Sequence, residues 1–566
     1  MTIRSKRLLL ALSLVAVLFV IPGVALMSLR PAAPQIARST AIVLEVSGEM
    51  LEYHPAFAPG ALFGPRELTL TDALACLDAA AKDARVTGVV LRIYPSGAGA
   101  AKCQELARAV GRFRASGRRA VAFSPILYGH HYLVASAADS LFMPPSGYLV
   151  VPGPASSATY LRGAFDKLGI KPNIHRIERY KSAAETYTET GRSPESREMA
   201  GWLLADLYEG FVEDAAAARG VGADTVRRWI DRGLYSPASA LESGLIDGIR
   251  HWDEIEAIFE ERGDVLLDAA DYLRAKRAAA PFAGPRVAVI HAQGVIEAGE
   301  NGFSPVSGEV MGARTIAAEL RRAREDGAVR AVVLRVDSPG GDGIAGDLVS
   351  REVELTSLEK PVVVSMSDVA ASGGYEIAYR ADRILALPAT FTGSIGSITG
   401  KLNLRGLYDK LGIAKDEIGT APNSLIYSDY RDFSEEERRL VEEEHWRFYR
   451  GWIEEIARFR EMPVDSIDGL ARGRVWTGSQ AVSNGLVDEI GDLSRAVEVA
   501  CGLAGIDSSR VALVHYPRRT TLFQQMLSRN LLEEAAARVL RRALFDDALR
   551  RGGLFIRHEA PVELLR

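Results

Sequence analysis

The chain contains an internal duplication, and this feature constrains its fold more than any other. Residues 88–97 (GVVLRIYPSG) are similar to residues 331–340 (AVVLRVDSPG), and residues 161–170 (LRGAFDKLGI) are similar to residues 404–413 (LRGLYDKLGI). Both pairs lie at the same offset of 243 residues along the chain. Self-similarity at a fixed offset indicates two copies of one structural unit.

The second copy carries a small deletion. Residues 235–249 (YSPASALESGLIDGI) match residues 476–490 (WTGSQAVSNGLVDEI) at an offset of 241, so two residues are missing ahead of this segment. We predict that one unit spans residues 40–260 and the other residues 285–500. A chain of 566 residues is long enough to form more than one core of this size.

Strands and helices are predicted to alternate within each unit. Residues 330–338 and 361–368 are short β-branched runs beside Pro or Gly, which is typical of buried strands, and residues 346–358 between them have helical spacing. This alternation predicts an α/β fold with parallel strands. Residues 433–460 predict a long charged helix with Ser434 at its N-cap.

The N-terminus predicts a membrane anchor over residues 1–30. Three basic residues precede an uncharged run from Leu8 to Leu29, which as a helix is about 33 Å long and matches a bilayer. Because flanking positive charges stay in the cytoplasm, the remainder is expected on the extracytoplasmic (periplasmic) side of a cell inner membrane. A cleaved signal peptide is the competing interpretation.

Composition excludes several other classes of function. The formal net charge of −5 gives no support for binding nucleic acid. The three cysteines, Cys76, Cys103 and Cys501, are too scattered to predict a disulfide framework or a zinc site. We therefore expect neither a cofactor nor a metal ion.

Two glycine-rich turns in the second unit are candidates for chemistry. Ser372 lies in AASGGY, just after a predicted strand, where a sharp turn exposes a hydroxyl nucleophile. The N–H of Gly373, with that of Gly340 or Gly341 in DSPGG, would form an oxyanion hole. Ala-Ser-Gly-Gly is also a common helix N-cap sequence, so Ser372 has a purely structural alternative.

The first unit has Gly129 where the second has Ser372, so only the second unit is predicted to carry a nucleophile. A serine nucleophile also needs a general base. No pattern centred on a histidine stands out: His445 lies within the predicted long helix, and His130 and His131 stand in the first unit where Gly373 and Gly374 stand in the second. A lysine serves instead where burial keeps it neutral near pH 7.

Four segments together resemble the long, tandem form of the signal peptide peptidase A family. They are RYKSAAETYT (179–188), VDSPGGDG (336–343), SDVAASGGYEIA (367–378) and TGSIGS (392–397). The resemblance implies two ClpP/crotonase-like repeats and a Ser/Lys dyad split between them. It assigns Ser372 as nucleophile, Lys181 as general base, and Ser394 as the residue that orients the lysine.

The resemblance further implies a homotetramer whose substrates are remnant signal peptides and other extended hydrophobic peptides. Two alternatives stay open: an inactive protease-like scaffold or membrane regulator, and a crotonase-type acyl-CoA enzyme. The Arg-rich extension over residues 515–566 has no counterpart in the resemblance. It is interpreted either as an amphipathic membrane or subunit contact or as a solvated tail.

Overall fold

The computed structural model describes residues 34–54, 68–278, 284–304 and 307–518. The predicted anchor (1–30) and nearly all of the C-terminal extension (515–566) lie outside these residues. None of the described helices has the length and apolarity needed to cross a bilayer.

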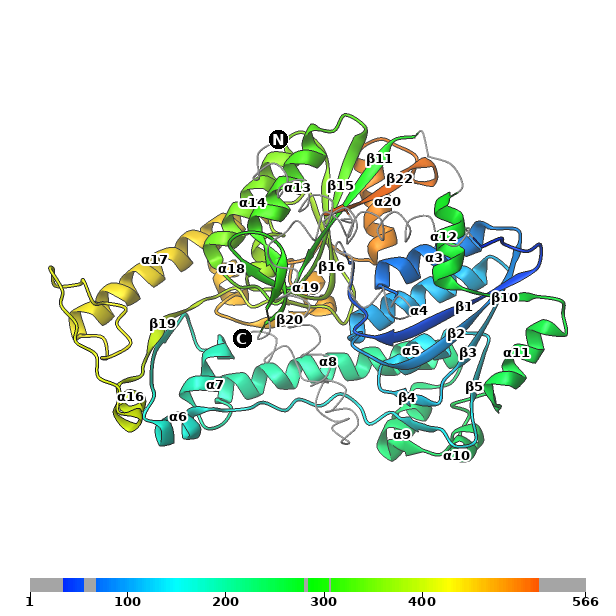
Figure 1. Ribbon diagram of the computed structural model, residues 1–566, viewed down its shortest axis with the longest axis horizontal. Coiled ribbons are helices and arrows are strands. Elements are labelled where there is room, and N and C mark those ends of the chain that lie inside the picture. The colour runs from blue at the N-terminus through cyan, green and yellow to red at the C-terminus, as the bar shows by residue number, and fades with distance from the viewer. Residues whose placement is uncertain (1–33, 55–67, 279–283, 305–306, 519–566) are drawn as a thin grey trace, which may run out of the picture.

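The first unit is built on a six-stranded parallel sheet in the order β10-β1-β2-β3-β5-β9 (Figure 1). The central strands are rich in buried apolar residues, as expected of a parallel sheet that helices cover. They are β1 (Thr40–Gly48), β2 (Val86–Ser96), β3 (Arg119–Phe123), β5 (Ser140–Met143), β9 (Gly248–Ile249) and β10 (Val265–Asp268). The helices are α3 (Leu70–Lys82), α4 (Ala100–Ala115), α5 (His131–Ser136), α9 (Ala223–Arg232), α10 (Pro237–Glu242), α11 (Trp252–Glu260) and α12 (Ala269–Ala278), beside the short strands β4 (Ile126–Tyr128), β6 (Tyr148–Val150) and β8 (Leu234–Tyr235).

The second unit repeats this plan in an eight-stranded sheet whose main order is β20-β18-β16-β15-β11-β22. Its strands are β11 (Arg286–Gln293), β15 (Val329–Ser338), β16 (Val362–Ala371), β17 (Arg383–Ala386), β18 (Phe391–Gly393), β20 (Val475–Thr477), β21 (Glu489–Ile490) and β22 (Ala512–Tyr516). Its helices are α13 (Ala313–Glu325), α14 (Gly343–Ser357), α15 (Gly373–Glu376), α18 (Val464–Leu470), α19 (Gly478–Ser483) and α20 (Leu493–Leu503), beside the short strands β12 (Val295–Glu297), β13 (Gly302–Ser304) and β14 (Gly308–Gly312).

The predicted elements of the second unit are present. The predicted strands are β15 and β16, and the predicted helix between them is α14, so the α/β prediction is confirmed. The long helix is α17 (Glu435–Phe459), which Ser434 caps together with Glu437 in a capping box. Each sheet also includes a strand just beyond the predicted unit, β10 in the first and β22 in the second. These short edge strands gave no distinct signal in the sequence.

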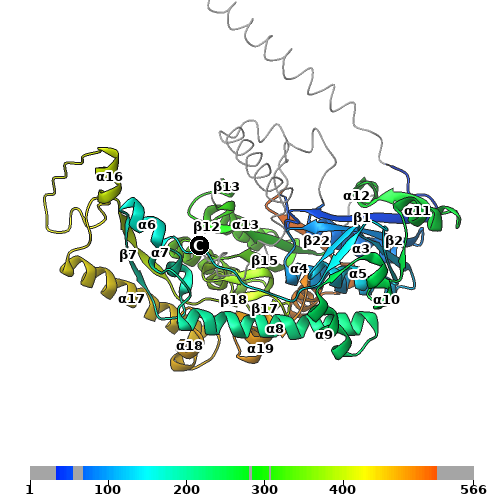
Figure 2. The same ribbon diagram turned by 90° about the horizontal axis from the view of Figure 1, so that it is seen from below.

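The first unit sends a long extension across the second. It comprises α6 (Arg162–Leu168), β7 (Lys171–Arg176), α7 (Glu185–Thr188) and α8 (Pro194–Arg219). Figures 1 and 2 both show α8 running alongside the second unit, where Trp202 stacks on Trp476 with ring centroids 5.1 Å apart. Strand β7 pairs antiparallel with β19 (Ile398–Asn403) of the second unit, near α16 (Arg405–Leu411). The segment between β7 and α7 is thereby held against the second sheet.

The interface between the units buries a network of charges. Arg335 on β15 is fully buried and donates to Glu52 at 2.9 Å and also to Glu105, both from the first unit. Lys102 on α4 likewise donates to Asp337 at the end of β15, at 2.7 Å. A buried charge without a partner is strongly destabilising. Each unit supplies the countercharges for buried charges of the other, so the charge network favours the packed arrangement of the two units.

A carboxylate of the second unit caps a helix of the first. Helix α4 begins after Gly99, which has no side chain to accept from the first N–H groups of the helix. Asp368 on β16 accepts instead, from the N–H of Gly99 at 2.8 Å and from that of Lys102 at 2.9 Å. This cap fixes α4 to the strand that leads into Ser372.

We expect Asp368→Asn to lower the thermal unfolding midpoint, with a loss of about 0.3–1 kcal/mol, the usual worth of a negative charge at a helix N-terminus. An amide keeps the shape but not the charge that favours a helix N-terminus. The matched control is Asp507→Asn, because Asp507 caps an exposed turn within one unit and should have little effect. Equal midpoints for Asp368→Asn and the unmodified protein would contradict the proposed cap.

Candidate active site

Ser372 lies on a strained turn at the point where β16 ends and α15 begins. Its φ is +56° and its ψ is −120°, a conformation that is costly for a residue with a side chain. The turn is held by the Ser372 N–H, which donates to the Gly393 carbonyl at 2.8 Å. The Ser372 hydroxyl makes no capping bond to α15, so the purely structural alternative for this serine is not observed.

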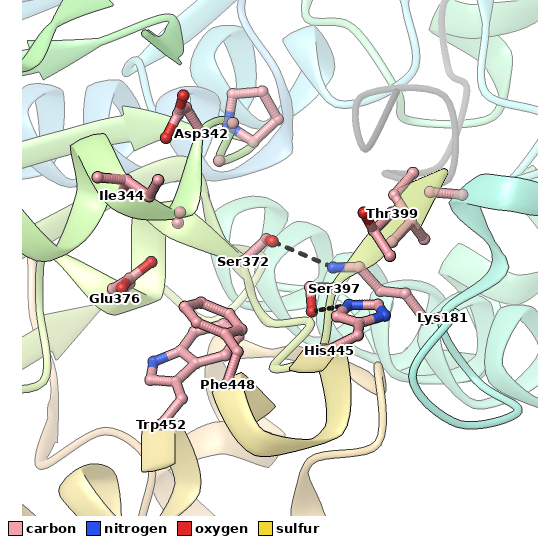
Figure 3. Close-up of a pocket in the computed structure, with 18 residues that line it drawn as sticks. Lys181, Asp342, Ile344, Ser372, Glu376, Ser397, Thr399, His445, Phe448 and Trp452 are labelled. Atoms are coloured by element: carbon pink, nitrogen blue, oxygen red, sulfur yellow. Dashed lines mark hydrogen bonds between the residues drawn. The ribbon is translucent and has the colours of Figure 1, made fainter. Parts of the chain in front are cut away.

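The structure brings Lys181 and Ser394 to this hydroxyl, as predicted. Lys181 follows β7 in the extension of the first unit, and its Nζ lies 3.1 Å from Ser372 Oγ. Nζ also lies 2.9 Å from both the carbonyl oxygen and the Oγ of Ser394. Figure 3 shows the Lys181 and Ser372 side chains pointing toward one another. The candidate site therefore contains residues from both units.

The surroundings of Lys181 favour the neutral amine. The residue is 5% exposed, and burial lowers its pKa from 10.5 to about 7, with no carboxylate contributing to the shift. A neutral amine has two N–H groups and one lone pair. Donation to the two Ser394 oxygens uses both N–H groups and leaves the lone pair to accept from the Ser372 hydroxyl.

Two further backbone positions fix the lysine. Ser394 also has a positive φ, +50°, and its N–H donates to the Arg474 carbonyl at 2.6 Å. Gly473 has a φ of +85°, and a Cβ added there would lie only 2.3 Å from the backbone nitrogen of Lys181. Sequence reasoning did not identify Gly473, because nothing in its local sequence shows that the other unit packs against it.

The three predicted oxyanion glycines have different roles in hydrogen bonding. The Gly340 N–H already donates to Ser338 Oγ at 3.2 Å. The N–H groups of Gly341 and Gly373 have no acceptor within the described part of the chain. These two residues lie close together in space, since a Cβ added to Gly373 would lie 3.3 Å from the Gly341 nitrogen. Of the two alternatives for the second donor, Gly341 is the one with an available N–H.

A cavity of about 360 Å³ opens onto Ser372 and Lys181. Ile344 on α14 and Phe448 and Trp452 on α17 give part of its wall an apolar surface, beside the Glu376 carboxyl, as Figure 3 shows. Sequence reasoning treated α17 mainly as a charged, solvated helix and missed these wall residues. Their helical spacing was visible, but the cavity forms only when α17 packs across the end of α14.

Comparison with known proteins identifies a matching family and relatives that are similar over most of the chain. The model of peptidase family S49 matches residues 121–265 and 354–507. The chain is 36% identical to "Serine protease SPPA, chloroplastic" of Arabidopsis thaliana over 460 residues, which is 79% of this chain and 68% of that protein. It is 30% identical to "Protease 4" of Haemophilus influenzae over 458 residues, 77% of this chain and 73% of that protein.

Among solved structures, the chain matches the "1510-N membrane-bound stomatin-specific protease K138A mutant in complex with a substrate peptide". It is 14% identical, with a TM-score of 0.28, and the match covers 44% of this chain and 98% of that chain.

Replacing the buried lysine with an apolar side chain should stabilise the protein. Moving a lysine pKa from 10.5 to about 7 costs the folded state on the order of 5 kcal/mol while the amine is charged in the unfolded chain. This destabilisation has its full value below pH 7, where the amine is charged in both states, and it decreases between pH 7 and pH 10.5. Lys181→Met should therefore raise the thermal midpoint clearly at pH 6.5 and much less at pH 9.5.

The matched control for that measurement is Lys171→Met, because the Lys171 side chain is 71% exposed and has no burial cost to relieve. A Lys181→Met midpoint that rises equally at both pH values would argue against a neutral, desolvated amine.

A methyl group at Gly473 should displace Lys181 from Ser372. We expect Gly473→Ala to reduce peptidase activity by about 100-fold, the usual cost of moving a reacting group by about 1 Å. Gly505→Ala is the control, because Gly505 has a similar φ of +65° with no atom within 4 Å of its added Cβ. It tests the backbone strain without the clash, and its activity should be nearly unchanged.

Proposed function

The chain belongs to peptidase family S49 and is a serine endopeptidase, and we propose that Ser372 is its nucleophile and Lys181 its general base. The observation that carries this proposal is the 3.1 Å contact between Ser372 Oγ and the buried Lys181 amine. A serine hydroxyl attacks a peptide carbonyl only if a base removes its proton, and burial lowers the pKa of this amine to about 7, so that a large share of it is neutral at that pH.

In the proposed first step, the Ser372 hydroxyl gives its proton to the Lys181 lone pair as Oγ attacks the scissile carbonyl. The developing oxyanion accepts from the N–H groups of Gly341 and Gly373, which stabilise charge that is absent from the ground state. The Lys181 ammonium then protonates the leaving amine as the tetrahedral intermediate collapses. Ser394 keeps the amine aimed at Ser372 throughout.

In the second step, the neutral amine takes a proton from water, and the resulting hydroxide attacks the ester formed with Ser372. The same two glycine N–H groups stabilise the second oxyanion. Collapse of this intermediate releases the carboxylic acid product and returns the proton from Lys181 to Ser372. The cycle needs no group beyond the residues of the two units and one water molecule.

We propose that the substrates are extended, hydrophobic peptides, including remnant signal peptides. The support from the structure is the apolar surface of Ile344, Phe448 and Trp452 beside the nucleophile.

We propose that residues 8–29 anchor the protein in a cell inner membrane, that the catalytic part is extracytoplasmic, and that the protein forms a homotetramer. The first of these rests on the uncharged N-terminal run and the last on the family resemblance.

The two alternative functions, a crotonase-type acyl-CoA enzyme and an inactive scaffold, do not require both Ser372 and Lys181. An acyl-CoA enzyme of the crotonase type needs oxyanion N–H groups but no serine nucleophile with a lysine base. An inactive scaffold has no need for a strained serine at φ +56° or a lysine buried without a countercharge, both of which destabilise the fold. Such costs are retained where chemistry needs them.

Ser372→Ala and Lys181→Ala should each reduce cleavage of a hydrophobic peptide by at least about 1,000-fold and abolish labelling by a fluorophosphonate probe. Lys181→Arg should be as inactive, because a guanidinium does not deprotonate in this range. The matched control is Ser397→Ala, since Ser397 also lines the cavity but its hydroxyl bonds to His445 Nε2.

The pH profile tests the base directly. Only the neutral amine accepts a proton, so kcat/KM should rise between about pH 6 and pH 8 with an apparent pKa near 7. A rate that stays constant down to pH 5, or a Lys181→Ala variant that still reacts with the probe, would refute the assignment of Lys181.

A further inference from the structure

The first unit contains a second cluster of reactive side chains at the position that corresponds to the active site. Residues 129–131 (Gly-His-His) occupy the place of residues 372–374 (Ser-Gly-Gly) at the offset of 243. Cys103 on α4 corresponds in the same way to Gly346 on α14. The first unit thus has a thiol and two imidazoles where the second has three glycines.

These three side chains are close together in space. The ligating atoms that Cys103, His130 and His131 offer all lie within 4.8 Å of one another, and this is the one such group of three among the described residues. Cys103 and His131 are buried, and the two rings stack with centroids 5.0 Å apart. Atoms bound to one ion at about 2.0–2.3 Å lie within about 4 Å of each other. A shift of about 1 Å, within reach of side-chain rotation, would bring the group to that spacing.

Main-chain carbonyls orient both rings as they do in metal sites. His130 Nε2 lies 2.8 Å from the Ala98 carbonyl and His131 Nδ1 lies 3.1 Å from the Tyr128 carbonyl. A carbonyl oxygen only accepts, so each of these nitrogens carries the proton. The second nitrogen of each neutral ring then has the lone pair that a metal needs. A histidine ligand generally donates its other N–H to a carbonyl or carboxylate in this manner.

Ser96 shows that one of these lone pairs is accessible to a partner. Its N–H and its hydroxyl lie 3.3 and 2.8 Å from His131 Nε2, so this nitrogen accepts from Ser96. A metal ion would take the place of the Ser96 hydroxyl proton. The set of one thiolate and two imidazoles suits soft or borderline ions and excludes magnesium and calcium, which prefer oxygen.

We propose that Cys103, His130 and His131 bind one thiophilic d¹⁰ metal ion, Zn²⁺ or Cu⁺. Binding forms two metal–nitrogen bonds and one metal–sulfur bond and releases the thiol proton to solvent, with no change in oxidation state. The site is distinct from the catalytic residues, all of which lie on other elements. The spacing of the ligands in the sequence is irregular, and for this reason the sequence predicted no metal site.

The test uses the full-length protein, stripped of metal with a chelator and kept reduced. We expect it to take up one equivalent of Zn²⁺ or, in a separate titration, of Cu⁺, in competition with a chromophoric chelator. Co²⁺ substituted for Zn²⁺ should give a thiolate-to-metal charge-transfer absorption, which reports a sulfur ligand. Cys103→Ser should abolish that absorption and weaken binding by more than about 100-fold, the upper range for loss of an outer-shell partner.

The other two cysteines provide the matched controls. Cys76 and Cys501 are also buried, so Cys76→Ser/Cys501→Ser removes every thiol except Cys103 and should retain both the absorption and the stoichiometry. This variant assigns the sulfur even if Cys103→Ser does not fold, which circular dichroism would reveal. Failure of the unmodified protein to bind either ion, or equal binding by a folded Cys103→Ser, overturns the proposal.

Discussion

The burial of the Lys181 amine between the two units is the constraint on which the site depends. Neither unit buries this side chain alone, because the lysine comes from the extension of the first unit and its partners, Ser372 and Ser394, come from the second. Burial without a countercharge is unfavourable for folding and is the single cause of the lowered pKa. The feature that costs stability is therefore the one that brings the pKa of this amine close to neutral pH.

The fold offsets this cost at the interface around the site. A stacked pair, Trp202 and Trp476, holds the long helix of the extension to the second unit. On the other side of the nucleophile strand, Arg335 and Asp368 satisfy buried groups of the first unit. Asp368 lies on β16, four residues before Ser372. The contacts that join the units therefore also fix the position of Ser372.

Much of the architecture was predictable because it follows from local patterns. The strands around residues 330–338 and the capped helix after Ser434 have signatures that depend on neighbouring residues alone. The proximity of Lys181 to Ser372 was predictable only through family resemblance, since 191 residues separate them. Gly473 and the cavity wall at Phe448 were not predictable. Their roles arise from packing between segments that are distant in the sequence, and nothing in either segment's sequence indicates that they meet.

The two units differ at the turn that holds Ser372 in the second unit. That turn has little room for side chains at Gly341 and Gly373, since an added Cβ would lie 2.1 Å from the Ile296 carbonyl oxygen at the first and 3.1 Å from Ile296 Cδ1 at the second. In the first unit the equivalent of Gly373 is His130, whose ring bonds to the Ala98 carbonyl across that space. An imidazole there is incompatible with an oxyanion hole. The proposed site therefore needs the two units in different roles, with the turn at Ser372 from one and the amine of Lys181 from the other.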